Sequence, residues 1–272
     1  MFARNYYYLV TSLPDLVFEH PRSPVSAAAF MDDLAEFLDP EDAALLRIVR
    51  LPADNANFIT LLESRDRELQ PGGNYTRDEL LEEIKQPDAL PDYLQILARA
   101  YREGRQLFPG MILEDQLNLL FYEQVIAHPN AFIAAWFTFE LNLRNVLVAL
   151  TLRKKLPHLQ GQHTASVLCC NEIAEHILKS TAPDFGLCDA LPWIDYVVEI
   201  QEEEIPEREQ ELDRLRWNML DELTIASYFR IETLLAFCIK LMIVERWMRL
   251  DSAVGRQKLA RMVEEIIRRV EY

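Results

Sequence analysis

The chain has 272 residues, half of them hydrophobic, so it can bury a substantial core and is not a disordered protein. A formal net charge of −16 argues against general binding to nucleic acid or to anionic lipid, because both attract basic surfaces. With only seven glycines and long periodic runs of Leu, Glu, Ala and Arg, the sequence predicts an all-α fold of about ten helices.

The first 70 residues predict an N-terminal helical lobe. The run Tyr6-Tyr7-Tyr8 is rich in β-forming residues and predicts a short strand or an extended arm. Ser26 can cap a helix that runs to about Leu38, and Pro40 suits the first position of the next helix. Breaks are then predicted at Arg50 to Pro52 and at Pro71 to Asn74.

A middle helical lobe is predicted over residues 71–160. Thr76 and Glu79 have the spacing of a capping box at the start of a helix. Helices are also predicted over Asp92 to Leu107, Leu113 to Ala127 and the strongly apolar stretch Ala131 to Leu152.

Residues 161–272 predict a C-terminal lobe with long helices, and the three lobes are also compatible with one continuous domain. The dense acidic block Glu199 to Asp213 is interpreted as a solvated helix or an exposed connector. From Pro206 the chain predicts one or two very long helices to about Met248, including a second apolar stretch, Thr224 to Val244. A final helix is predicted from Ser252.

Neither apolar stretch is a clean membrane span, because each carries charged residues near its middle, and both are better interpreted as packed helices of a soluble protein. In the first stretch, Thr138, Asn142 and Asn145 fall on one helical stripe. Glu140 and Arg144 fall on the opposite stripe, at a spacing that suits an ion pair within the helix. Two apolar faces remain between the stripes, so this helix is predicted to pack on more than one side.

The motifs expected of an enzyme are missing from the sequence. There is no G-x-S-x-G, no Gly-rich phosphate loop and no H-E-x-x-H or E-x-x-H unit. The cysteines lack disulfide and zinc spacing, which favours a reducing cytoplasm; they are Cys169, Cys170, Cys188 and Cys238. The sequence therefore predicts a protein that is not an enzyme and binds no metal or other cofactor.

Polar residues in and beside the apolar stretches are the candidate site residues. They either satisfy one another inside the protein or line a shared cavity or a partner surface. Glu222, Thr233 and Lys240 are predicted to share one stripe of a single long helix. The candidates are Glu140, Asn142, Arg144, Glu222, Arg230, Glu232 and Lys240.

Four segments carry a resemblance to known proteins. Tyr6 to Asp15 and Leu51 to Ile59 resemble an uncharacterised bacterial family encoded with V-type ATPase subunits. That family is in turn similar to the C-type subunit, also designated d-type, of the V-type and A-type rotary ATPases. Glu140 to Leu147, with the basic end Arg153 to Lys155, is similar to an Asn-Leu-Arg/Lys run and basic tail in helices of the C-type subunit. Ser227 to Arg246 resembles the last long helix of the same family.

The resemblance implies a funnel-like assembly of helical lobes that works as a non-catalytic central-stalk linker. Such a linker seats the rotating central shaft on the membrane rotor ring of a proton- or sodium-transporting V-type ATPase. Its implied partners are the shaft and ring subunits, with no nucleic acid and no membrane span of its own. Its implied location is the cytoplasm, peripheral to the inner membrane.

Two other functions agree with the same sequence. One is a small-molecule enzyme or binding protein with a pocket between the two apolar helices, which predicts stabilisation by ligand and its loss on Glu140→Ala or Arg144→Ala. The other is a cytoplasmic adaptor outside the ATPase, which differs only in its partner.

Overall fold

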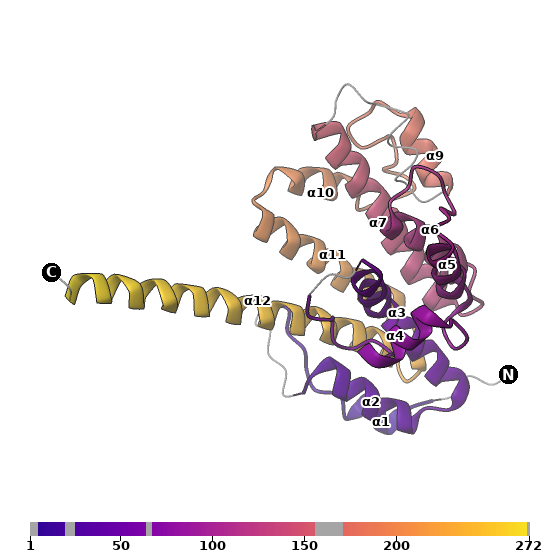
Figure 1. Ribbon diagram of the computed structural model, residues 1–272, viewed down its shortest axis with the longest axis horizontal. Helices are drawn as coiled ribbons and strands as arrows, with labels where there is room; N and C mark the ends of the chain where they lie inside the picture. Colours follow the sequence, from indigo (N-terminus) through magenta and orange to yellow (C-terminus); the bar gives the residue numbers. More distant parts are fainter. Residues whose placement is uncertain (1–4, 20–24, 64–66, 156–170, 271–272) are drawn as a thin grey trace. The chain divides into compact units, whose positions relative to one another are not determined.

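The computed structural model describes residues 5–19, 25–63, 67–155 and 171–270 of the chain. These residues form α-helices and one short 3-10 helix, with no strand among them, which confirms the predicted all-α class. Figure 1 shows their course along the chain. The helices are α1 (Tyr7–Thr11), α2 (Ala27–Phe37), α3 (Pro40–Leu62), α4 (Arg77–Lys85), α5 (Asp92–Arg102), α6 (Leu113–Ile126), α7 (Ala131–Lys155), α9 (Glu172–Lys179), α10 (Ile194–Glu199), η1 (Ile200–Glu202), α11 (Ile205–Thr224) and α12 (Ile231–Val270).

The helices group into two compact units whose boundaries differ from those of the three predicted lobes. Unit 1 is built from residues 1–43 and 220–272, so it joins the two ends of the chain. Unit 2 comprises residues 44–219. The chain passes between the units within α3 and again within α11.

Unit 2 is organised around α7, which packs against α6, α9 and α10 (Figure 1). Ile133, Leu143 and Val146 of α7 are fully buried. Phe137 of α7 meets Phe121 of α6 edge to face, with ring centroids 5.2 Å apart. The packing of α7 on several neighbours confirms the prediction made from its two apolar faces.

By length and composition, α7 is also the one helix among the described residues that could cross a membrane. More than half of its most apolar window is buried inside the protein.

Unit 1 is built on the first half of α12, which packs against α2 and α1, while its second half continues past them (Figure 1). Phe30 of α2 lies against Phe237 of α12 with ring centroids 5.1 Å apart. The backbone N–H of Ala27, at the start of α2, donates to the Glu245 carboxylate at 3.1 Å. That carboxylate occupies the favourable position for an anion at a helix N-terminus.

Two local predictions for helix starts are confirmed. The hydroxyl of Ser26 accepts a hydrogen bond from the Ala29 N–H and caps α2. The Thr76 side chain and the Glu79 carboxylate form the predicted capping box at the start of α4.

The tyrosine run does not form a strand or an extended arm, because Tyr7–Thr11 is a short helix. Its N-terminal end is held by contacts from distant parts of unit 1. The N–H of Tyr6 donates to the carbonyl of Phe229 at 2.6 Å, and the Tyr7 ring lies 4.7 Å from the Phe229 ring. These tertiary contacts override the β propensity of the run.

The second apolar stretch is not one helix, since α11 ends at Thr224 and α12 begins at Ile231. Successive turns between them are closed by hydrogen bonds from the Ser227 N–H to the Thr224 carbonyl and from the Arg230 N–H to the Ser227 carbonyl. The boundary predicted at Ser252 was also wrong, because α12 is continuous through it.

The break predicted at Pro52 was wrong as well, because α3 runs through this proline. A proline inside a helix removes one backbone hydrogen bond and costs about 3 kcal/mol. Phe58 is fully buried and Leu62 nearly so, and this apolar burial offsets the cost. The polar residues that follow Pro52 bind another part of the chain and add to the stability of this second half of α3.

These polar residues attach α3 to the turn before α4. The Asp54 carboxylate accepts hydrogen bonds from the Asn74 N–H at 2.7 Å, the Asn74 amide at 2.6 Å and the Tyr75 N–H at 3.2 Å. A Cβ at Gly73 would overlap the Asp54 carboxylate, so the turn needs glycine there. Asn57 exchanges two hydrogen bonds with the backbone of Gln70.

The Asp54 carboxyl is fully buried, and burial raises its pKa, although the hydrogen bonds from Asn74 and Tyr75 partly oppose this rise. Arg50 adds two donors, from Nε to the Gly72 carbonyl and from Nη2 to the Gly73 carbonyl. The segment Leu51 to Ile59 thus acts in this fold by fixing the path of the following turn.

We expect Asp54→Ala to lower the free energy of unfolding by about 2–3 kcal/mol, because two backbone N–H groups of the turn lose their acceptor. Glu82→Ala is the matched control, since Glu82 is exposed in the middle of α4, and its change should stay within about 0.5 kcal/mol. Urea denaturation followed by circular dichroism measures both values. Equal stability of the two variants would contradict a structural role for Asp54.

Candidate functional site

The three candidate residues of the first apolar stretch lie near the middle of α7, within unit 2. Glu140 and Arg144 are directed to one side of the helix and Asn142 to the other, as the predicted stripes require. Each of the three bonds to a residue on another element of unit 2. We call Glu140, Asn142, Arg144 and their bonding partners the α7 polar cluster.

On the charged side, Glu140 binds Arg216 of α11. The guanidinium donates from Nε to one Glu140 oxygen at 2.8 Å and from Nη2 to the other at 3.4 Å. The same guanidinium donates from Nη1 to Asp213 at 2.9 Å. Arg216 therefore bridges two carboxylates, and it fixes α11 against α7.

Burial distinguishes this triad from a surface ion pair. The side chain of Asp213 is 2% exposed, and those of Glu140 and Arg216 are 18% and 21% exposed. Burial alone lowers the pKa of the Arg216 guanidinium, but the charges of Glu140 and Asp213 outweigh this effect and raise it above its usual value. Arg216 is therefore held in its charged form.

One turn further along α7, Arg144 binds Asp115 of α6, with 2.5 Å between Nη2 and the carboxylate oxygen. Burial raises the pKa of Asp115, and the Arg144 charge lowers it only in part. The intrahelical pair that the i, i+4 spacing suggested is therefore replaced. Glu140 and Arg144 each bind a different neighbouring helix.

On the opposite side of α7, Asn142 and Asn145 both meet Asn171, the residue that caps α9. The side-chain amide of Asn171 donates to Oδ1 of Asn142 at 2.7 Å. The side-chain amide of Asn145 donates to Oδ1 of Asn171 at 3.5 Å. The same Asn171 oxygen accepts from the Ala174 N–H and closes the α9 N-terminus. The asparagine stripe thus sets where α9 begins.

The other four candidates lie in unit 1. Glu222 is exposed on α11 and Arg230 is exposed in the turn before α12. Lys240 of α12 binds Asp221 of α11 at 2.5 Å. The stripe predicted for Glu222, Thr233 and Lys240 does not exist on one helix, because Glu222 belongs to α11.

Glu232 lies in the first turn of α12, a favourable place for a negative charge. Its Oε2 atom is buried and has no hydrogen-bond partner among the described residues.

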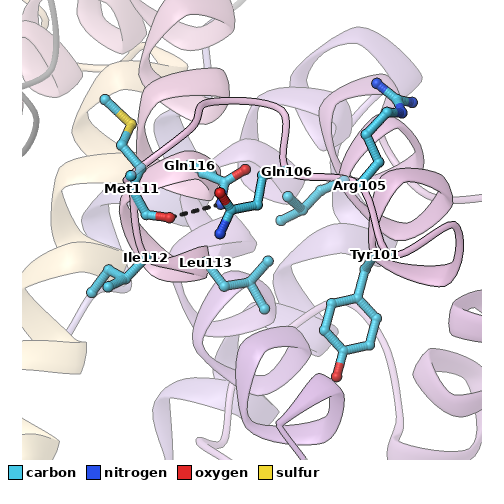
Figure 2. A pocket seen from close by; sticks show the side chains of 10 residues that line it. Tyr101, Arg105, Gln106, Met111, Ile112, Leu113 and Gln116 are labelled. Atoms are coloured by element: carbon cyan, nitrogen blue, oxygen red, sulfur yellow. Dashed lines mark hydrogen bonds between the residues drawn. The ribbon is translucent and has the colours of Figure 1, made fainter.

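A hollow of about 470 Å³ lies at the loop between α5 and α6, and Figure 2 shows its lining. Its buried polar residue, Gln116, is committed to the loop backbone. The amide donates to the Met111 carbonyl at 3.0 Å, and the oxygen accepts from the N–H of Leu107 and of Phe108. None of the residues that line the hollow belongs to the α7 polar cluster.

Within the described ranges, no three His, Cys, Asp or Glu side chains are grouped as metal ligands. Cys169 and Cys170 lie outside these ranges. What the α7 polar cluster does is structural, because its charges and amides bond to one another across four helices.

The sequence did not identify Arg216, Asp213, Asp115 or Asn171 as partners of α7. Arg216 is 76 residues from Glu140, and the only local sign was a pair of basic residues, Arg214 and Arg216, after a dense acidic block. The polar residues of α3 did give a local signal that they have partners elsewhere in the fold. Asp54, Asn55 and Asn57 interrupt an apolar helix within four positions.

The fold and the cluster define an all-helical protein with a buried polar network at the centre of one of its units. The chain matches over residues 3–270 the family described as Protein of unknown function (DUF2764), and it belongs to that family. No curated protein and no solved structure matches the chain.

Removal of Arg216 should cost about 3 kcal/mol of stability, because Arg216→Ala leaves the buried Asp213 and the part-buried Glu140 without their shared cation. Arg77→Ala, at an exposed position on α4, is the matched control and should change stability by less than about 0.5 kcal/mol. Adding Glu140→Ala to Arg216→Ala should cost less than the sum of the single effects, since the two residues interact directly. Additive losses in urea denaturation would show that the pair contributes no coupling energy.

Proposed function

We propose that this protein is a non-catalytic central-stalk linker of a V-type rotary ATPase, which joins the rotor shaft to the membrane rotor ring. The proposal starts from the resemblance of Tyr6 to Asp15, Leu51 to Ile59, Glu140 to Leu147 and Ser227 to Arg246 to the V-type ATPase-associated family and to the C-type subunit. A linker in this position transmits torque, so it needs a stiff body and a surface that matches its neighbours.

The observation that carries the proposal is the structural use of the residues that carry the resemblance. Glu140, Asn142 and Arg144 attach α11, α9 and α6 to α7. Asp54 and Asn57 attach α3 to the turn before α4. These polar groups are bonded inside unit 2, and such networks make a protein interior rigid. Rigidity is what a mechanical linker requires.

The charge of the chain supports a basic protein partner over nucleic acid or lipid. Acidic residues outnumber basic ones by 44 to 28. Glu202, Glu203, Glu204 and Glu207 are exposed around η1 and the start of α11, the region predicted from the sequence to be solvated or to act as a connector. In this proposal the protein works in the cytoplasm, peripheral to the inner membrane through the ATPase.

The same observations disfavour a ligand pocket built from Glu140 and Arg144. Both side chains are already engaged by oppositely charged partners on other helices. A ligand would have to displace Arg216 or Asp115 in order to reach them.

Purification of the affinity-tagged full-length protein from gently solubilised native membranes tests the proposal. We expect the shaft and ring subunits of the V-type ATPase to be recovered with it in fixed proportion, and quantitative mass spectrometry measures that proportion. The Arg77→Ala protein, altered at an exposed residue of α4, controls for nonspecific losses. Recovery of the tagged protein without the shaft and ring subunits would contradict the proposal.

A further inference from the structure

Unit 1 exposes a group of large apolar side chains on two neighbouring segments. Tyr7 and Tyr8 of α1 are 54% and 92% exposed. Ile225 and Tyr228, in the turn between α11 and α12, are each 74% exposed. Single exposed apolar residues are ordinary, but an exposed group of them is typical of an interaction site. We call these four residues the tyrosine surface.

Specific contacts hold the two segments together. The Tyr6 N–H donates to the Phe229 carbonyl, and the Tyr7 ring lies against the Phe229 ring, next in sequence to Tyr228. The Tyr6 hydroxyl bonds to Asp42 and, at 3.2 Å, to Asp39 at the start of α3. The tyrosine surface is therefore preorganised, which lowers the entropic cost of binding.

The charge of the surrounding chain defines the partner. Residues 5–19 and 25–43, which form α1, α2 and the start of α3, contain eight carboxylates and no Lys, Arg or His. Residues 220–230 add two carboxylates, Asp221 and Glu222, and one cation, Arg230, so the two segments together are strongly acidic. Tyrosine supplies apolar area at low entropic cost and is frequent among the residues that dominate binding energy. An apolar surface within an acidic segment is complementary to a partner that is both apolar and basic.

We propose that the tyrosine surface binds a basic amphipathic helix of a partner protein. The apolar face of such a helix would cover Tyr8, Ile225 and Tyr228, and its Lys and Arg residues would meet the acidic N-terminal segment, in the helix-on-apolar-surface mode of recognition. Anionic lipid and nucleic acid are disfavoured by the same charges. The chemistry of the partner follows from the surface alone, and only its identification with an ATPase subunit rests on the proposed function.

The test uses the full-length protein and two synthetic 20-residue helical peptides with identical leucine positions. One peptide carries Lys at its polar positions and the other carries Glu. Isothermal titration calorimetry should show binding of the Leu/Lys peptide, which weakens as salt is raised, and no binding of the Leu/Glu peptide. The double variant Tyr8→Ser/Tyr228→Ser should bind the Leu/Lys peptide at least tenfold more weakly.

Ile112→Ser is the control variant, because Ile112 is 63% exposed in unit 2, and it should leave the affinity unchanged. Circular dichroism of each variant verifies folding. Equal binding of the Leu/Lys peptide by the double variant, or absence of binding by the unaltered protein, would overturn the proposal. A dimer that the double variant abolishes would also overturn it, by assigning the surface to a second copy of the chain.

This result is separable from the proposed function. If the peptide binds as described while the ATPase subunits do not co-purify, the surface assignment holds and the ATPase assignment fails. If the subunits co-purify equally well with the double variant, the ATPase assignment holds and the tyrosine surface is not the contact.

Discussion

The organisation of unit 2 depends on how α7 buries polar groups on two opposite sides. A helix that packs on several neighbours shields most of its polar side chains from solvent, so these residues need partners inside the protein. Arg216 meets this need on one side by bridging Glu140 and Asp213, and Asn171 meets it on the other by bonding Asn142 and Asn145. The polar groups therefore determine which neighbour lies on which side.

The ion triad of Glu140, Arg216 and Asp213 adds little to the overall stability of unit 2. Its main effect is to select one placement of α11 against α7. Desolvation of the three charges offsets much of their attraction, so the intact triad gives little net stability. A shift of α11 along α7 would separate Arg216 from Glu140, however, and breaking such a shielded pair costs several kcal/mol. Apolar packing provides most of the stability of unit 2. The triad makes one register of α11 along α7 more stable than the shifted registers.

Local signals in the sequence predicted the features that depend on local physics. The Ser26 cap, the Thr76–Glu79 capping box and the helical stripes of α7 follow from residues within a turn or two of one another. The partners of those stripes could not be predicted, because Glu140 and Arg216 are brought together only by the tertiary fold. The continuation of α3 through Pro52 was missed for the same reason, since contacts to the turn at Gly73 and Asn74 outweigh the local preference of proline.

The division of the chain into two units gives the candidate residues two different roles. The α7 residues are internal bonds of unit 2, whereas Glu222 and Arg230 are exposed beside the tyrosine surface of unit 1. The proposed linker role has both of these requirements, because such a protein must be stiff within and complementary to its partners outside. The α7 residues that first suggested a cavity bond to neighbouring helices of unit 2 instead.

A structure of the intact V-type ATPase from the native membrane, determined by electron cryomicroscopy, tests the central claim most directly. The account predicts all-helical density between the central shaft and the membrane ring that fits unit 2, with the α7 helix at its centre. A complete rotor whose shaft contacts the ring through a different polypeptide, with no density for this chain, would contradict it.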